Sequence, residues 1–181
     1  MRGYHVAIVG ATGAVGTELL RLLESRHFPV RQLTLFASER SAGKTLPFMG
    51  ELLPVQRLSP EWFRGVEIAF FAAGAARSRE YAPDAVRAGA IVVDNSSAFR
   101  LEPDVPLVIP EINPEALAQH RGIIANPNCS TIIMLMALEP LRRLTPIRRI
   151  IVSTYQSASG AGAQAMAELL ESTRAFLQGE P

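Results

Sequence analysis

Residues 4–16 read YHVAIVGATGAVG, and this stretch decides the fold. The apolar, partly β-branched run Tyr4–Val9 is typical of a buried strand, and it ends at a glycine. Glycines at positions 10, 13 and 16 permit a tight turn and close packing of a following helix on the strand. Ala14–Ser25 then shows helical periodicity. The stretch therefore predicts a strand, a turn and a helix, which together begin a βαβ unit.

Strand and helix signals continue to alternate along the chain. Apolar runs predict further strands at residues 32–37, 66–72, 90–93 and 122–125, with a strand-like segment at 107–109. Residues 38–45 form a polar loop in this interpretation, and residues 81–88 form a short helix ended by Gly89. The alternation predicts an α/β fold, a Rossmann-like, doubly wound, mostly parallel sheet.

The pattern changes at Cys129. Helical periodicity at 130–143 is followed by a long predicted strand at 148–156, a Gly/Ser-rich turn at 157–162 and a helix at 163–177. One strand between two helices is too little to form a sheet. We therefore expect a dinucleotide-binding domain at residues 1–128. Residues 129–181 would begin an incomplete α+β catalytic and dimerisation domain, whose remainder lies beyond Pro181.

Composition narrows the functional classes. The chain has 181 residues, of which 48% are apolar, and a net charge of +1, which gives no electrostatic reason to expect nucleic acid or membrane as partner. A single cysteine fits a reducing cytoplasmic setting. We expect no signal peptide, because glycines interrupt the first apolar run, and no membrane span. The three histidines are scattered, so no metal site is expected.

Cys129 is the candidate nucleophile. It lies in NPNCST, residues 126–131, where an apolar strand gives way to an apolar helix. Unpaired N–H groups and the positive end of the helix dipole would stabilise a thiolate at that point. A lone cysteine is otherwise often an inert core residue. The polar neighbours and the strand-to-helix position favour the nucleophile.

The glycine turn suggests a dinucleotide cofactor. Its glycines would let the backbone approach a pyrophosphate, although an ordinary βα turn has the same requirement for glycine. An NAD site usually has an acidic residue after the second strand, where this chain has Ser38, Glu39, Arg40 and Ser41. Arg40 can pair with a 2′-phosphate and the serines can donate hydrogen bonds, whereas Glu39 could instead bind the ribose. Together the features favour NADP.

Five motifs in order resemble aspartate-semialdehyde dehydrogenase: GATGAVG (10–16), SERSAG (38–43), DNSS (94–97), NPNCST (126–131) and YQSASG (155–160). The resemblance runs along the whole chain and covers about the first half of that family's sequence. It implies the NADPH-dependent reduction of L-4-aspartyl phosphate to L-aspartate 4-semialdehyde, a step in lysine, threonine and methionine biosynthesis. It also implies an enzyme that forms a homodimer when complete.

The resemblance also implies roles for individual residues. Cys129 would form the acyl-thioester, Arg100 would hold the phosphoryl group, Asn128 would help position the reacting carbonyl, and Gln156 would contact the aspartyl group. The remaining implied positions all bind the cofactor: Gly10, Thr12, Gly13, Ala14, Val15 and Gly16 at the pyrophosphate, Ser38, Arg40 and Ser41 at the 2′-phosphate, and Ser159 and Gly160 near the nicotinamide. From the residues alone, Arg100 could be a surface arginine, and Gln156 and Ser159 could be strand-end and turn residues.

In that family the general-base histidine and the arginine for the substrate carboxylate lie in the second half of the sequence. None of His5, His27 and His120 stands in a motif suited to replace that base. We therefore expect the 181-residue chain alone to bind cofactor better than it turns over substrate. Two alternatives stay open: a related reductase acting on N-acetyl-glutamyl phosphate or malonyl-coenzyme A, and a non-catalytic NADP-binding module.

Overall fold

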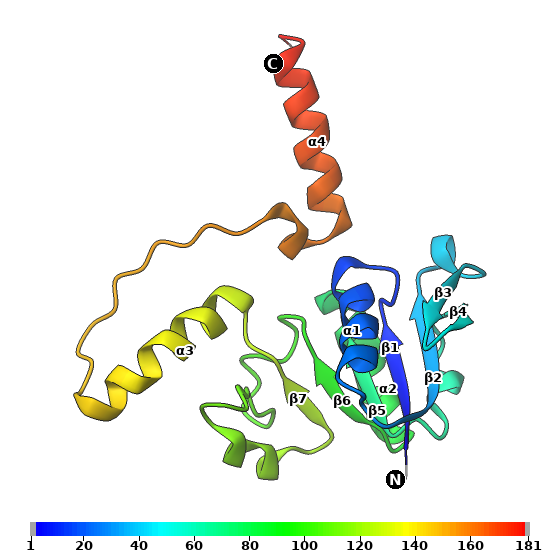
Figure 1. The fold of residues 1–181 in the computed structure, drawn as a ribbon, viewed down its shortest axis with the longest axis horizontal. Helices are drawn as coiled ribbons and strands as arrows, with labels where there is room; N and C mark the ends of the chain where they lie inside the picture. The colour runs from blue at the N-terminus through cyan, green and yellow to red at the C-terminus, as the bar shows by residue number, and fades with distance from the viewer. Residues whose placement is uncertain (1–2, 180–181) are drawn as a thin grey trace. The chain divides into compact units, whose positions relative to one another are not determined.

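The computed structural model describes residues 3–179 and contains the predicted α/β sheet (Figure 1). Its strands are β1 Tyr4–Val9, β2 Val30–Ala37, β3 Thr45–Phe48, β4 Glu51–Arg57, β5 Ile68–Phe71, β6 Ile91–Asp94 and β7 Ile123–Ala125. They lie in the order β3-β4-β2-β1-β5-β6-β7, and every pairing except the antiparallel β3–β4 hairpin is parallel. The mostly parallel, Rossmann-like sheet is confirmed.

The helices are α1 Ala14–Ser25, α2 Ala75–Arg87, α3 Cys129–Leu144 and α4 Ala163–Leu177, with short 3-10 turns η1 Glu39–Ser41, η2 Pro60–Phe63, η3 Pro114–Gln119 and η4 Ala158–Ala161. Strand β1 and helices α1 and α4 have the predicted bounds. Helix α2 starts earlier than the predicted segment at 81–88. Its first residues are mostly exposed and charged, but Ser78, Ala82 and Ala85 make one buried face that continues across Pro83.

The core has two faces because both sides of β1 are buried. Val6 and Ile8 pack with Leu20 and Leu35 on one side of the sheet. Ala7 and Val9 contribute to a second cluster on the other side, which contains Phe36, Phe63, Phe71 and Val92. Such burial on both faces is typical of a doubly wound parallel sheet.

The β3–β4 hairpin is missing from the prediction, which ended a polar loop at Thr45 and assigned no element to residues 46–57. Pro47 and Pro54 argue against strands because proline cannot donate to a ladder. Here β3 is an edge strand, and β4 pairs with β2 only from Val55 to Arg57, beyond Pro54. Both prolines therefore avoid the positions where a donor is required. The strand-like segment at 107–109 makes one isolated bridge, from Leu107 to Ala125.

The chain forms two compact units that divide between Thr145 and Pro146. In the second unit, residues 146–157 have no regular secondary structure, so the strand predicted at 148–156 is wrong. Within residues 3–179 no strand pairs with this segment, and β-branched residues alone do not make a strand without a hydrogen-bonded neighbour. The domain boundary at residues 128 and 129 remains a prediction, since spatial contacts group α3 with the sheet.

None of the helices in the described part of the chain has the length and apolar character needed to cross a membrane. Nor does any group of three His, Cys, Asp or Glu side chains gather in a metal-binding arrangement among residues 3–179.

Candidate active site and cofactor pocket

The candidate site segments of the first unit follow the carboxyl ends of parallel strands. The glycine turn follows β1, Ser38 follows β2, Asn95 follows β6 and Asn126 follows β7. The sheet order reverses at β1, which has β2 on one side and β5 on the other. Ligands of open α/β sheets bind in the crevice at such a switch point. The fold therefore places these segments along one edge of the sheet.

Two glycines, one in the turn after β1 and one in the first helical turn of α1, occupy positions that no other residue fits. Gly10 has φ +91°, and a Cβ there would lie 2.7 Å from the Ala72 carbonyl oxygen. A Cβ on Gly16 would lie 2.2 Å from the Gly10 carbonyl oxygen. The backbone of Gly10 also donates a 2.8 Å hydrogen bond to the Phe36 carbonyl, which ties the turn to β2. The glycines therefore let α1 start close against β1.

The start of α1 is open to a ligand. Gly13 is its N-cap and provides no side chain to bond the first N–H groups of the helix. Ala14 and Val15 at this end are exposed, and Thr12 is half-buried. Uncapped N–H groups and the positive end of the helix dipole form an anion site. This cradle fits the pyrophosphate of a dinucleotide.

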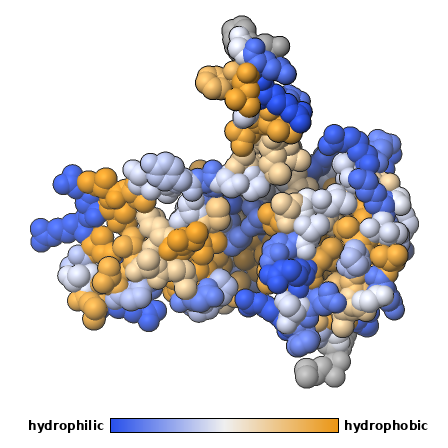
Figure 2. All heavy atoms as spheres, turned by 45° about the horizontal axis from the view of Figure 1, so that its top comes forward, coloured by the Kyte–Doolittle hydropathy of each residue, from blue (hydrophilic) through white to orange (hydrophobic). Residues whose placement is uncertain are grey.

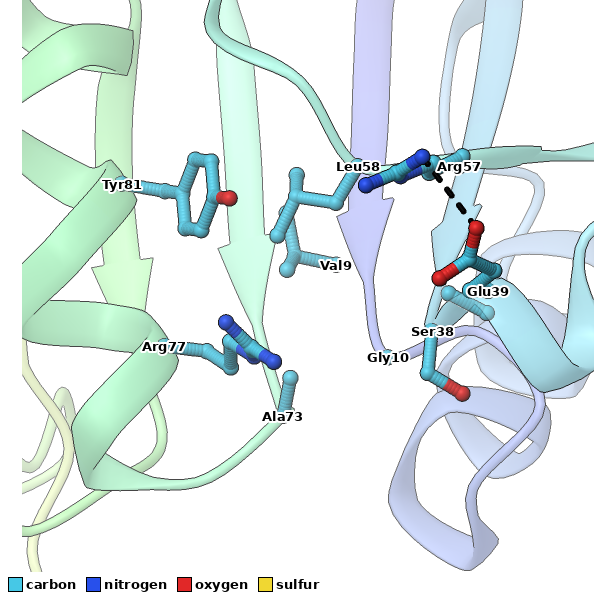
Figure 3. Close-up of a pocket in the computed structure, with 10 residues that line it drawn as sticks. Val9, Gly10, Ser38, Glu39, Arg57, Leu58, Ala73, Arg77 and Tyr81 are labelled. Carbon is cyan, nitrogen blue, oxygen red and sulfur yellow. Dashed lines mark hydrogen bonds and ion pairs between the residues drawn. The ribbon is translucent and has the colours of Figure 1, made fainter.

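A pocket of about 230 Å³ lies beside this turn (Figure 3). Glu39 and Arg57 on its rim form an ion pair of 3.3 Å between Oε1 and Nη1. Burial raises the pKa of the Tyr81 hydroxyl, and the neighbouring Glu80 raises it further, so Tyr81 is neutral. The lining comprises Val9, Gly10, Ala37, Ser38, Glu39, Arg57, Leu58, Ala73, Arg77 and Tyr81.

The pocket includes only part of the predicted 2′-phosphate set. Ser38 lines it, whereas Arg40 and Ser41 lie in the adjoining turn η1, and Arg40 is exposed. Sequence reasoning missed Arg57 because β4 was not predicted. It also missed Arg77 and Tyr81, although their spacing of four residues on a helix places them on one face. That spacing was a usable signal.

Cys129 is the first residue of α3 and its side chain is exposed. Asn128 is the N-cap, and its Oδ1 accepts a 3.0 Å hydrogen bond from the Ser130 N–H. The Asn128 carbonyl accepts from the Ile132 N–H at 2.9 Å and closes the first helical turn. The structure thus has the Cys129 thiol at the start of a helix, as predicted. The cap occupies Asn128 Oδ1 and leaves its amide NH₂ available to a ligand.

Arg100 is half-buried and is held by the loops after β6 and β7. Its Nε donates to the Asn126 carbonyl at 2.9 Å, and its Nη2 donates to the Asn95 carbonyl at 3.2 Å. The side chains of Asn126 and Asn95 are bonded to each other at 2.6 Å. These two contacts use Nε and Nη2 and hold the guanidinium against the loops after β6 and β7. Arg100 is therefore fixed to a residue three positions before Cys129.

A buried carboxylate supports the loop that carries Arg100. Asp94 is fully buried at the end of β6 and accepts hydrogen bonds from Ser78 at 2.6 Å and from Ser96 at 2.8 Å. The Ser96 hydroxyl in turn accepts a 3.0 Å bond from the Ala98 N–H. Buried carboxylates need such donors, and these donors link α2, β6 and the Arg100 loop.

Gln156, Ser159 and Gly160 belong to the second unit. Ser157 caps the turn η4 by accepting a 3.3 Å bond from the Ser159 N–H. A Cβ on Gly160 would lie 2.0 Å from Gln156 Nε2, so the glycine makes room for the glutamine side chain. Ser159 and Gly160 lie in η4, which precedes α4, and Gln156 lies just before that turn.

Comparison with known proteins agrees with this architecture. Residues 5–120 match the family "Semialdehyde dehydrogenase, NAD binding domain", and residues 138–181 match "Semialdehyde dehydrogenase, dimerisation domain". The first match indicates a nicotinamide cofactor.

Curated relatives of this chain are named aspartate-semialdehyde dehydrogenase. The chain is 59% identical to aspartate-semialdehyde dehydrogenase of Synechocystis sp. (97% of this chain, 52% of the relative) and 55% identical to that of Bacillus subtilis (99% and 52%). A crystal structure of aspartate semialdehyde dehydrogenase II from Vibrio cholerae, complexed with ASA, superimposes with TM-score 0.91 at 50% identity, covering 100% of this chain and 55% of the other. The chain spans about half the length of the curated relatives it matches. It belongs to the semialdehyde dehydrogenase family.

Proposed function

We propose that this chain supplies the cofactor-binding and nucleophilic parts of an aspartate-semialdehyde dehydrogenase, which reduces L-4-aspartyl phosphate with NADPH. The observation that carries the proposal is the exposed Cys129 at the start of α3, three residues after Asn126, whose carbonyl holds Arg100. The names of the relatives favour the aspartyl substrate over other acyl phosphates or acyl-coenzyme A. A biosynthetic enzyme of this kind, with one free cysteine, fits the cytoplasm.

The geometry fits acyl transfer. The Cys129 thiolate attacks the acyl carbon, the C–O bond to phosphate breaks, and inorganic phosphate departs with the bonding electrons, which leaves a thioester. Arg100 pairs with the departing phosphate. N–H groups at the start of α3 and the Asn128 amide stabilise the developing oxyanion. Gln156 contacts the aspartyl group in this scheme.

The cofactor site fits the second half of the reaction. When bound, the nicotinamide supplies the hydride that converts the thioester to the aldehyde, and the Cys129 sulfur leaves as thiolate. Gly10, Gly13 and Gly16 admit the pyrophosphate to the α1 N-terminus, where the N–H groups of Ala14 and Val15 bind it. Thr12 lines the same turn. Ser159 and Gly160 would approach the nicotinamide end.

We propose NADP rather than NAD as the preferred cofactor. Ser38, Arg40 and Ser41 follow β2, where a 2′-phosphate lies in such folds. Arg40→Ala should selectively weaken NADP binding by about 1.5–3 kcal/mol, the worth of a hydrogen bond to a charged group. Calorimetry with NADP and NAD measures this difference. Equal weakening of both would remove Arg40 from the 2′-phosphate site.

We further propose that the complete enzyme is a homodimer. Residues 138–181 match a dimerisation domain, and the side chains of Leu141 and Leu144 are 52% and 83% exposed. Apolar side chains at this exposure favour association. Light scattering on a complete enzyme that carries this chain should give twice the monomer mass.

A chimera tests the catalytic proposal. These 181 residues replace the corresponding first half of the Synechocystis relative. The chimera should catalyse the phosphate-dependent oxidation of aspartate semialdehyde to aspartyl phosphate, with reduction of NADP to NADPH. Cys129→Ser should abolish this turnover while leaving NADP affinity unchanged. Arg100→Ala should raise KM for phosphate. The same assay with N-acetyl-glutamate semialdehyde tests the related reductase.

The thiol itself gives an independent readout. In the 181-residue chain, Cys129 should react with iodoacetamide in the native fold at neutral pH, faster than a model peptide thiol, because it is exposed at a helix start. Inorganic phosphate should slow the reaction through Arg100. An active chimera with Cys129→Ser, or a Cys129 that reacts only after denaturation, would contradict the catalytic role. No turnover together with normal NADP binding would leave a cofactor-binding module.

A further inference from the structure

We infer that the Glu39–Arg57 ion pair determines nucleotide specificity, because Arg57 exchanges Glu39 for the 2′-phosphate of NADP. The inference rests on the proposed nicotinamide cofactor and adds two residues to its recognition. Neither residue belongs to the catalytic end of the site. Arg57 comes from a strand that the sequence pattern does not reveal.

The sheet brings the two residues together. Ala37, the last residue of β2, is the register partner of Arg57, the last residue of β4. Ser38 and Glu39 follow directly on β2. Glu39 Oε1 and Arg57 Nη1 are 3.3 Å apart, and both residues line the pocket, whereas Arg40 does not (Figure 3).

The pocket suits the adenosine part of the cofactor. Its volume of about 230 Å³ is below the roughly 300–1,000 Å³ typical of sites for drug-sized ligands, so it takes part of a dinucleotide. Val9, Leu58 and Tyr81 provide an apolar surface for the adenine ring. Ser38, Glu39 and Arg57 provide polar groups after β2, where the ribose 2′-oxygen lies in this fold.

The ion pair is easy to exchange. The side chains of Arg57 and Glu39 are 69% and 79% exposed, and exposed ion pairs are weak. A phosphate dianion can accept two guanidinium hydrogen bonds and carries more charge than a carboxylate. Arg57 therefore prefers a 2′-phosphate to Glu39.

The two cofactors use the pair differently. With NAD there is no phosphate, so Glu39 can accept a hydrogen bond from the ribose 2′-hydroxyl while it stays paired with Arg57. With NADP the Glu39 carboxylate repels the phosphate, and the partner exchange of Arg57, added to the contact from Arg40, offsets this repulsion. The repulsion from Glu39 and the attraction to Arg57 together set the ratio of the binding affinities for NADP and NAD.

Calorimetry on the 181-residue chain with four ligands tests the inference: NADP, NAD, adenosine 2′,5′-bisphosphate and AMP. Arg57→Leu should lower the affinity for NADP and for the bisphosphate by about 10- to 100-fold. It should lower the affinity for NAD and AMP by less than about threefold. Glu39→Gln should strengthen the binding of NADP and weaken the binding of NAD. Arg121→Leu is the matched control, because Arg121 and Asp104 form a similar exposed pair, at 3.1 Å and with 76% and 72% exposure, outside the pocket lining.

The outcomes separate the inference from the proposed function. If both dinucleotides bind and Arg57→Leu weakens them equally, the exchange is wrong while the cofactor proposal stands. The same holds if Glu39→Gln weakens NADP. If no dinucleotide binds, the cofactor proposal fails and the inference fails with it. Selective loss of NADP and of the bisphosphate in Arg57→Leu, with no change in Arg121→Leu, supports the inference.

Discussion

A core of large apolar residues is buried in the first unit of the chain, whereas the large apolar residues of the second unit are exposed. In the first unit, Phe63 and Phe71 are fully buried on the sheet. In the second unit, Phe176 is 80% exposed and Tyr155 is 99% exposed. Figure 2 shows hydrophobic residues, in orange, at the molecular surface as well as hydrophilic ones, in blue. Apolar composition alone therefore does not make a core.

The difference follows from the secondary structure that each unit contains. The first unit has a sheet with apolar residues on both faces, and helices cover those faces. Within residues 146–179, the second unit has one helix, α4, and one short turn, η4. A single amphipathic helix has no surface of its own on which to bury its apolar stripe. Four predictions test this contrast, in order of decreasing effect.

Amide hydrogen exchange should separate the two units most strongly. Amides of β1 are bonded to strands on both sides, so they should exchange only through global unfolding, at a cost of about 5–15 kcal/mol. Residues 146–157 have no regular structure and should exchange almost without protection. Mass spectrometry of peptides from both regions measures this. Strong protection at 146–157 would show that the segment has a structured partner.

Truncating one phenylalanine in each unit should have unequal effects. Phe63→Ala should lower the free energy of unfolding by about 3–5 kcal/mol, because it opens a cavity beside Phe36 and Phe71. Phe176→Ala should change it by less than about 0.5 kcal/mol. Urea unfolding followed by fluorescence of Trp62, which adjoins Phe63, gives both values. Similar losses would mean that Phe176 is buried in solution.

Close packing in the first unit extends to the cofactor turn. In Gly16→Ala the new Cβ would lie 2.2 Å from the Gly10 carbonyl, so the backbone must shift. We expect a loss of about 1–3 kcal/mol in unfolding free energy and weaker dinucleotide binding. Gly13→Ala is the matched control, because its nearest contact is 3.3 Å and its φ is negative. Equal stability of the two variants would argue against tight packing of α1 on β1.

His5 should make the first unit sensitive to acid. Its ring is buried, with Nδ1 3.0 Å from the Gly65 carbonyl and Nε2 2.9 Å from Thr34 Oγ1. Burial lowers the pKa of His5 below its usual 6.5, although the Gly65 carbonyl opposes this effect. The unfolded chain therefore binds more protons, and stability falls as pH drops below about 6.5.

The His5 effect is measured by urea unfolding at about pH 7.5 and about pH 5.5, on either side of the ordinary histidine pKa. The wild-type chain should lose stability at the lower pH, and His5→Gln should lose less. A matched control is His27→Gln, which changes an exposed histidine. If His27→Gln removes the same pH dependence, the effect does not come from the buried ring.

Local signals were sufficient for several elements. The bounds of β1 and α1 follow from an apolar run, a glycine turn and helical periodicity, all within residues 4–25. Cys129 at the start of α3 follows from the polar NPN sequence before an apolar helix. These features depend on residues that are close in the chain, so the local sequence is enough to predict them.

Pairing between distant segments required the structure. The pattern did not predict β4, because Pro54 and exposed side chains hide a strand that is defined by its bonds to β2. The opposite error occurred at residues 148–156, where β-branched residues predict a strand but no neighbour within residues 3–179 pairs with it.

By itself, the sequence determined the alternating α/β order, the glycine turn and the thiol at a helix start, because each depends on residues within a few positions. Only the tertiary structure decided that Arg57 meets Glu39 and that Arg100 is held by Asn95 and Asn126. These contacts join separate strands at one edge of the sheet. Their partners are set by strand order and register, which no local pattern contains.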